Sequence, residues 1–78
     1  MNNQNIEVDV LNLVQNLLGT KIQLDEPLFD GGLVDSMTLV DLTLELETQF
    51  NVKFSAFEVK KDNFETPRVL AQFILKKK

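Results

Sequence analysis

Apolar residues near the start of the chain recur at the spacing of an α-helix. When the segment from about Asn5 to Leu18 is wound as a helix, they fall on one face, and only Val8 lies off it. Gly19 stands where a glycine commonly ends a helix. The pattern predicts a first helix with a buried face made of Ile6, Val10, Leu11, Leu13, Val14, Leu17 and Leu18.

The helical pattern is interrupted between residues 20 and 35. Pro27, Gly31 and Gly32 break regular structure, and a connection this long in a small domain is usually either functional or disordered. Its apolar residues indicate packing against the helices; they are Leu24, Leu28, Phe29 and Leu33. We therefore expect a long, packed loop after the first helix.

A second helix is predicted from Ser36 to about Phe50 or Asn51. Ser36 is a good N-cap residue, and Asp35 before it favours the positive end of the helix. Further on, Ser55 and Glu58 have the spacing of a capping box, which predicts a short helix that ends at Asp62 and Asn63.

Thr66 followed by Pro67 is typical of a helix start, with proline at the first helical position. The buried face of this last helix is predicted to contain Val69, Leu70, Phe73 and Ile74. Because no segment alternates like a strand, we predict an all-α fold. It is a small four-helix bundle of three main helices and one short helix, with a long loop between the first and second helices. Residues 1–78 form one domain, in which residues 1–4 fray and residues 76–78 are a lysine tail.

The second helix is apolar around more of its circumference than one buried face requires. One stripe contains Leu39, Leu42, Leu46 and Phe50, and the other contains Met37, Val40 and Leu44. The second stripe lies beside Ser36 and is bordered by Asp41, Glu47 and Thr48. Two interpretations stay open: both stripes are buried, or the second stripe is a partly exposed docking surface for a protein partner.

The composition excludes several kinds of site. The chain has no cysteine and no histidine, which removes thiolate zinc sites, thiol nucleophiles and imidazole acid-base catalysis. Its net charge of -4 disfavours nucleic acid and suits basic protein partners. No apolar run approaches the roughly 20 residues of a membrane span, and no signal-peptide pattern is present. We expect a cytoplasmic monomer without stable membrane insertion.

Ser36, considered alone, is explained by a helix cap worth about 1 kcal/mol. As a catalytic nucleophile it lacks a base. Gly31 and Gly32 are not followed by the Gly-Lys-Ser/Thr of a phosphate loop, and the nearby acids lack the spacing of a calcium loop. We therefore predict no catalytic residue and no metal site.

The run Leu28-Phe29-Asp30-Gly31-Gly32-Leu33-Val34-Asp35-Ser36-Met37 resembles the attachment site of phosphopantetheine carrier proteins. It looks closest to D-alanyl carrier proteins, which share a pattern of the form L-F-x-x-G-L-x-D-S-M. The likeness covers nearly the whole chain and includes Gln49-Phe50 and Thr66-Pro67. The chain departs from that family in two respects: the segment from Ser55 to Phe64 is slightly longer, and Phe64 stands where a tryptophan is usual.

The resemblance implies a non-catalytic protein that holds an acyl or aminoacyl group as a thioester on 4′-phosphopantetheine, attached to Ser36. In the family, a phosphopantetheinyl transferase adds the group from coenzyme A, and the aspartate before the serine, here Asp35, helps to bind magnesium at that transferase. Other implied partners are an acyl- or aminoacyl-activating ligase and downstream transferases. The positions that partners commonly contact correspond to Met37, Val40, Asp41, Leu44 and Glu47.

The resemblance leaves the cargo open. One possible cargo is D-alanine, which D-alanyl carrier proteins pass toward teichoic acid. The other is the acyl or aminoacyl group of a specialised carrier that serves the synthesis of fatty acids or other lipids, of polyketides or of nonribosomal peptides. From a different class, the alternative is an unmodified helical adaptor that binds a protein through the acidic and apolar face of the second helix, with Ser36 only as a cap.

Overall fold

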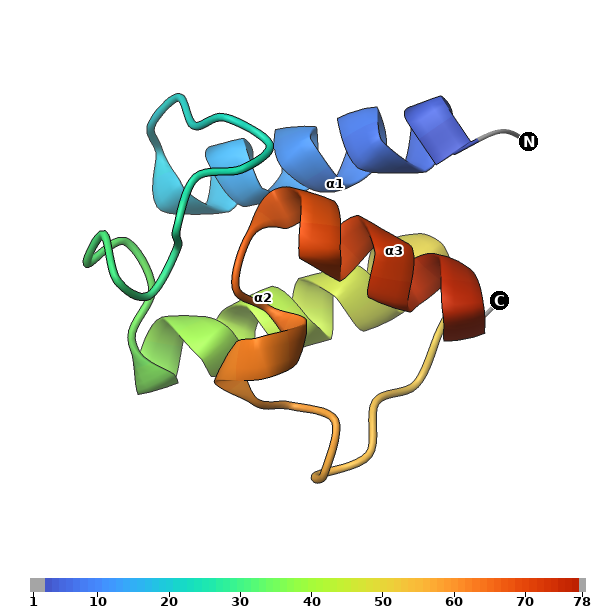
Figure 1. Cartoon of the computed structure of the whole chain (residues 1–78). Helices are drawn as coiled ribbons and strands as arrows, with labels where there is room; N and C mark the ends of the chain where they lie inside the picture. The colour runs from blue at the N-terminus through green and yellow to red at the C-terminus, as the bar shows by residue number, and fades with distance from the viewer. Residues whose placement is uncertain (1–2, 78) are drawn as a thin grey trace.

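The computed structural model describes residues 3–77, so the prediction for residues 1–2 and for Lys78 lies outside the described residues. Three α-helices, α1 (Asn3–Leu18), α2 (Ser36–Phe50) and α3 (Pro67–Lys77), are joined by connections that include one 3₁₀ helix, η1 (Lys61–Asn63) (Figure 1). Residues 3–77 contain no strand, and the all-α prediction is confirmed. None of the helices described is both long and apolar enough to cross a membrane.

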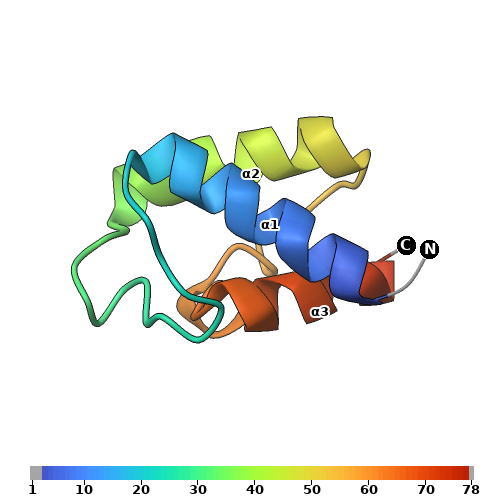
Figure 2. The same cartoon turned by 90° about the horizontal axis from the view of Figure 1, so that it is seen from above.

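Helix α1 lies across one side of the other two helices and packs mainly on α3 (Figure 2). Its predicted apolar face is confirmed, and Val8 is exposed as expected. Burial of such a face supplies most of the stability of a helix in a small domain. The three helices contribute to one core, whose buried residues include Ile6, Val10, Leu13, Val14, Leu42, Leu46, Phe50, Leu70, Ala71 and Ile74.

The helix ends follow the local chemistry of the sequence. The N–H of Gly19 donates to the carbonyl of Gln15 at 2.8 Å, and Gly19 has a φ of 72°, as a helix-ending glycine requires. At the start of α3, the N–H of Val69 donates to the Thr66 hydroxyl at 3.1 Å, and Pro67 is the first helical residue. Both predicted boundaries are confirmed.

The predicted short helix from Ser55 is not confirmed. The N–H of Ser55 does donate to the Glu58 carboxylate at 2.8 Å, as in a capping box, but the chain forms a turn over residues 56–58. The Glu58 carbonyl, which a continuing helix would use, accepts instead from Lys60 N at 3.0 Å and from Asn63 Nδ2 at 2.9 Å. Helical structure returns only in η1, where the sequence predicted an end.

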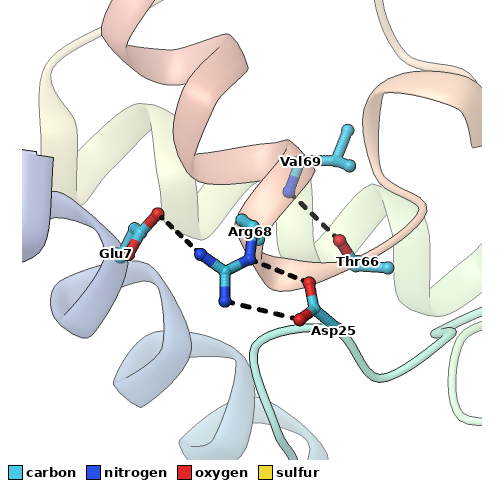
Figure 3. A network of polar contacts seen from close by, with 5 residues as sticks. All are labelled: Glu7, Asp25, Thr66, Arg68 and Val69. Atoms are coloured by element: carbon cyan, nitrogen blue, oxygen red, sulfur yellow. Dashed lines mark hydrogen bonds and ion pairs between the residues drawn. The ribbon is translucent and has the colours of Figure 1, made fainter.

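Several long-range contacts fasten the connection between α1 and α2 to the chain before and in α3. The Leu28 N–H donates to the Glu65 carbonyl at 2.9 Å. Figure 3 shows the guanidinium of Arg68 bonded to both carboxylate oxygens of Asp25, at 2.8 and 3.4 Å, and to Glu7 of α1 at 3.5 Å. These contacts place residues 24–28 against the helices.

Candidate functional site

The start of α2 is capped by Asp35. Its backbone is extended, and its Oδ1 accepts the N–H of Thr38 at 2.9 Å. The Asp35 carbonyl also accepts the N–H of Leu39 at 2.8 Å. The prediction that Ser36 is the N-cap is therefore wrong. Aspartate is as good a cap as serine, and its charge adds a favourable interaction with the helix dipole.

Because the Asp35 carboxylate caps the helix, the hydroxyl of Ser36 is not used as the helix cap. Ser36 is the first residue of α2 and is exposed. Its side chain makes no hydrogen bond with any residue that the structure describes. A hydroxyl in this state can be reached by a partner enzyme without breaking a contact in the fold.

The carboxyl group of Asp35 is ionised at neutral pH. The bond from the Thr38 N–H is the largest cause that holds the pKa of Asp35 below its ordinary value of 3.8. The group is exposed. An ionised, accessible carboxylate thus directly precedes the Ser36 hydroxyl.

The segment before Asp35 is held by two buried residues, Leu28 and Val34. The carbonyl of Leu28 accepts the N–H groups of Leu33 and Val34, both at 3.0 Å. Gly31 passes so close to Pro27 that a Cβ there would lie 2.6 Å from the Pro27 carbonyl oxygen. This compact turn fixes the chain that leads into Ser36, an arrangement of backbone groups that the sequence alone did not reveal.

The outer face of α2 is exposed, so the interpretation in which both stripes are buried is wrong. Met37 is 80% exposed, Val40 56% and Leu44 57%. Asp41 and Glu45 lie exposed on the same helix. The first stripe is the buried one, since Leu42, Leu46 and Phe50 are buried and Leu39 is half-buried.

Glu47, another predicted contact residue, has a structural partner. It is half-buried, and its Oε2 accepts the N–H of Phe54 at 2.9 Å. This bond holds the chain that follows α2, so Glu47 is less free to meet a partner than Asp41. The spacing along the helix could not reveal this contact, because Phe54 lies beyond the helix end.

No metal centre is found among the residues described, where no three acidic side chains come together to hold an ion. Two surface hollows lie away from Ser36. One is lined by Phe50, Asn51, Val52, Lys53 and Lys77, and the other by Leu13, Asn16, Leu17, Glu45 and Gln49. Ser36 is exposed and lines neither hollow.

Comparison with known proteins places this sequence in a family. Residues 8–74 match the model described as "Phosphopantetheine attachment site". The chain is 34% identical over 70 residues to the D-alanyl carrier protein of Leuconostoc citreum (strain KM20), covering 86% of this chain and 90% of the relative. It is 36% identical over 69 residues to that of Streptococcus pyogenes serotype M5 (86% and 87%), and 36% over 64 residues to D-alanyl carrier protein 2 of Lactiplantibacillus plantarum (80% of each). The chain belongs to the phosphopantetheine attachment family of carrier proteins, whose members carry 4′-phosphopantetheine covalently on a serine.

Proposed function

We propose that Ser36 is the attachment serine and that the chain is a cytoplasmic, monomeric carrier of an acyl or aminoacyl group. The observation that carries this proposal is the state of the Ser36 hydroxyl, which is exposed and free of hydrogen bonds within the described residues, because Asp35 caps the helix. Ser55 is the chain's other serine. It directly precedes the turn of residues 56–58 and lacks a neighbouring acid on its N-terminal side.

The residues around Ser36 suit the attachment. When bound, phosphopantetheine supplies a thiol on a flexible arm, on which cargo is held as a thioester. The chain itself presents the Ser36 oxygen at the start of a rigid helix and keeps the Asp35 carboxylate ionised beside it. It has no histidine to remove the hydroxyl proton. We therefore assign that step, and a magnesium ion held with the help of Asp35, to a phosphopantetheinyl transferase.

The partner enzymes dock on the exposed stripe of α2. Met37, Val40 and Leu44 offer an apolar surface next to Ser36, and Asp41 and Glu45 give it a negative border. Such a surface fits basic, partly apolar partners that bind briefly. These are the transferase, an acyl- or aminoacyl-activating ligase and downstream transferases, with Glu47 at the edge of the contact.

D-alanine is the cargo that the relatives favour, since the three compared above are named D-alanyl carrier proteins. The test is to incubate the phosphopantetheinylated chain with a D-alanine-activating ligase and ATP, and to measure its intact mass. A gain of one alanyl group with D-alanine, and none with L-alanine or fatty acids, supports this cargo. Loading by a fatty-acyl ligase alone would assign the chain to a specialised acyl pathway.

The attachment site is tested first. The purified chain is incubated with coenzyme A, magnesium and a broad-specificity phosphopantetheinyl transferase, and its mass and peptide map are recorded. We expect one phosphopantetheine on Ser36, no gain in Ser36→Ala, and an unchanged gain in the matched control Ser55→Ala. No gain in the folded wild-type chain, while a control carrier is modified in parallel, would favour the unmodified adaptor.

A further inference from the structure

A hollow of about 280 Å³ lies where α1 and α2 pack against each other (Figure 2). Helix α1 contributes Leu13, Asn16 and Leu17 to its lining, and α2 contributes Glu45 and Gln49. Residues three or four positions apart lie on the same side of a helix, so each helix presents one face to the hollow. Its volume is at the lower limit of small-molecule sites, roughly 300–1,000 Å³, and it suits one protruding side chain of a partner.

The buried part of the lining is apolar and the exposed part is polar. Leu13 is buried and Leu17 is half-buried, whereas Asn16, Glu45 and Gln49 are exposed. The side chains of these three polar residues form no hydrogen bond or ion pair with any residue that the structure describes. A carboxylate and two amide oxygens are therefore available as acceptors beside an apolar floor.

The two helices that form the hollow contain acids and no bases. Their acids are Glu7, Asp9, Asp41, Glu45 and Glu47. Glu7 is paired with Arg68 at 3.5 Å, and the other four form no ion pair within residues 3–77. The nearest bases along the chain, Lys21 after α1 and Lys53 after α2, are exposed and do not line this hollow. The charge of its surroundings is therefore negative, which favours a cation.

The ends of the two helices add to this attraction. Leu17 and Gln49 belong to the last turns of α1 and α2, where the partial charge of the helix dipole is negative. A basic side chain often stabilises this position, but neither last turn contains one. Glu45 and the two helix ends are thus independent sources of negative potential at the hollow.

Of the two common basic side chains, arginine matches this lining better. Its planar guanidinium can bind a carboxylate through two parallel bonds and has further N–H donors for amide oxygens. Its apolar stem can lie along leucine side chains. Lysine is a strongly hydrated point charge and is depleted at protein interfaces, where arginine is enriched.

The hollow adjoins the exposed stripe of α2. Met37, Asp41, Glu45 and Gln49 follow one another at intervals of four residues and so form one ridge along the helix. On a helical wheel, this ridge separates the exposed stripe from the buried one. Because Glu45 also lines the hollow, a partner docked on the stripe has the hollow at its edge.

We propose that the hollow receives an arginine side chain of an enzyme docked on the exposed stripe of α2. The guanidinium binds the Glu45 carboxylate, and the stem lies on Leu13 and Leu17. Glu45 follows Ser36 by nine residues, or roughly 14 Å along the helix, so one interface of ordinary size covers both. This inference rests on the proposed docking surface and extends it from α2 to α1.

The hollow is tested first without a partner enzyme. The ¹⁵N-labelled full chain is titrated with N-acetylarginine methylamide, and the backbone amide shifts are recorded by NMR. The lysine analogue keeps the charge of this probe, and the citrulline analogue keeps its shape without the charge. We expect saturable shifts centred on the lining residues with the arginine probe, weaker binding of the lysine probe and no binding of the citrulline probe.

Variants of the chain identify the acceptor groups. Glu45→Gln should reduce the affinity for the arginine probe about fivefold, and Gln49→Ala about two- to tenfold. Asp9→Asn is the matched control, because it removes an exposed acid of α1 that does not line the hollow; it should bind as the wild type does. All three altered side chains are exposed, so the variants are expected to fold.

The same variants are then assayed with partner enzymes, a phosphopantetheinyl transferase and a D-alanine-activating ligase. Glu45→Gln should raise the KM for the chain about fivefold with at least one of them and leave kcat nearly unchanged, since the contact is distant from the reacting atoms. Asp9→Asn should leave both constants as in the wild type.

Three results would overturn the proposal. They are shifts that stay linear with probe concentration, equal binding of the arginine and lysine probes, and an unchanged KM of Glu45→Gln with both enzymes. The carrier function fails separately. Modification of Ser36 without arginine binding overturns only the present proposal, whereas saturable arginine binding by a chain that is not modified on Ser36 overturns only the carrier assignment.

Discussion

Oδ1 of Asp35 accepts the N–H of Thr38 at 2.9 Å and thereby leaves the hydroxyl of Ser36 outside the helix cap. Two adjacent residues therefore have separate roles. The Asp35 carboxylate stabilises the start of α2, and the proposed attachment of phosphopantetheine uses the Ser36 hydroxyl. The two residues can therefore be separated by mutation.

Ser36→Ala is expected to leave the free energy of unfolding within about 0.5 kcal/mol of the wild-type value, because the lost hydroxyl is exposed and unbonded. Asp35→Ala removes the cap and should cost about 1 kcal/mol. Urea denaturation followed by circular dichroism measures both. A larger loss in Ser36→Ala than in Asp35→Ala would contradict the capping scheme.

The pH dependence of stability should reveal the same cap. The pKa of Asp35 is lowered in the folded chain, so its contribution is present above the ordinary value of 3.8 and disappears as the pH falls through the lower, folded value. Asp35→Asn retains a capping oxygen but does not titrate. The wild type should therefore lose stability relative to Asp35→Asn as the pH falls below 3.8. Parallel stability curves for the two proteins would count against this assignment.

The parts of the fold that the sequence predicted are those determined within one turn of chain. Gly19 ends α1 with a bond to Gln15, four positions away, and Thr66 caps α3 by accepting the N–H of Val69, three positions away. The sequence places the cap of α2 at Ser36, one residue after the actual cap, Asp35. Aspartate and serine are both good N-cap residues, and only the backbone conformation, which is extended at Asp35, distinguishes them.

Long-range contacts explain what could not be predicted. The segment from Ser55 was expected to be helical, but Lys77 and Asn63 engage Glu58 from outside that segment and stabilise a turn. Similarly, the periodicity of α2 shows two apolar stripes without showing which one the other helices cover. That choice depends on the packing of α1 and α3, which left Met37 exposed.

Gly31→Ala should disturb the turn that leads to Ser36. The new Cβ would lie 2.6 Å from the Pro27 carbonyl oxygen, so backbone must move. We expect a loss of about 1 to 3 kcal/mol and slower modification of Ser36. Gly19→Ala is the control: it has a φ of 72° with no atom within 4 Å of the new Cβ, so it should cost about 1 kcal/mol and leave the modification rate unchanged. Equal rates for both variants would contradict a role of the turn in presenting Ser36.

The bidentate pair of Arg68 and Asp25 (Figure 3) should couple weakly, because the Asp25 side chain is largely exposed and that of Arg68 is partly exposed. A double-mutant cycle with Arg68→Lys and Asp25→Asn is expected to give a coupling free energy of up to about 1 kcal/mol. Lysine cannot reproduce the two parallel bonds. The coupling should shrink at high salt, and a larger, salt-independent value would show that this contact is more shielded than its exposure indicates.

Asp41→Lys tests whether the exposed stripe of α2 is the docking surface. The substitution reverses the charge beside Met37, Val40 and Leu44, so encounter with a basic partner should slow about tenfold or more at low salt, while the free energy of unfolding changes by less than about 0.5 kcal/mol. The measurement is kcat/KM of the transferase acting on Ser36. Asp9→Lys makes the same charge change at an exposed position of α1 and should have a much smaller effect. If the two variants slow the reaction equally, net charge alone accounts for the effect, and the stripe is not where the transferase binds.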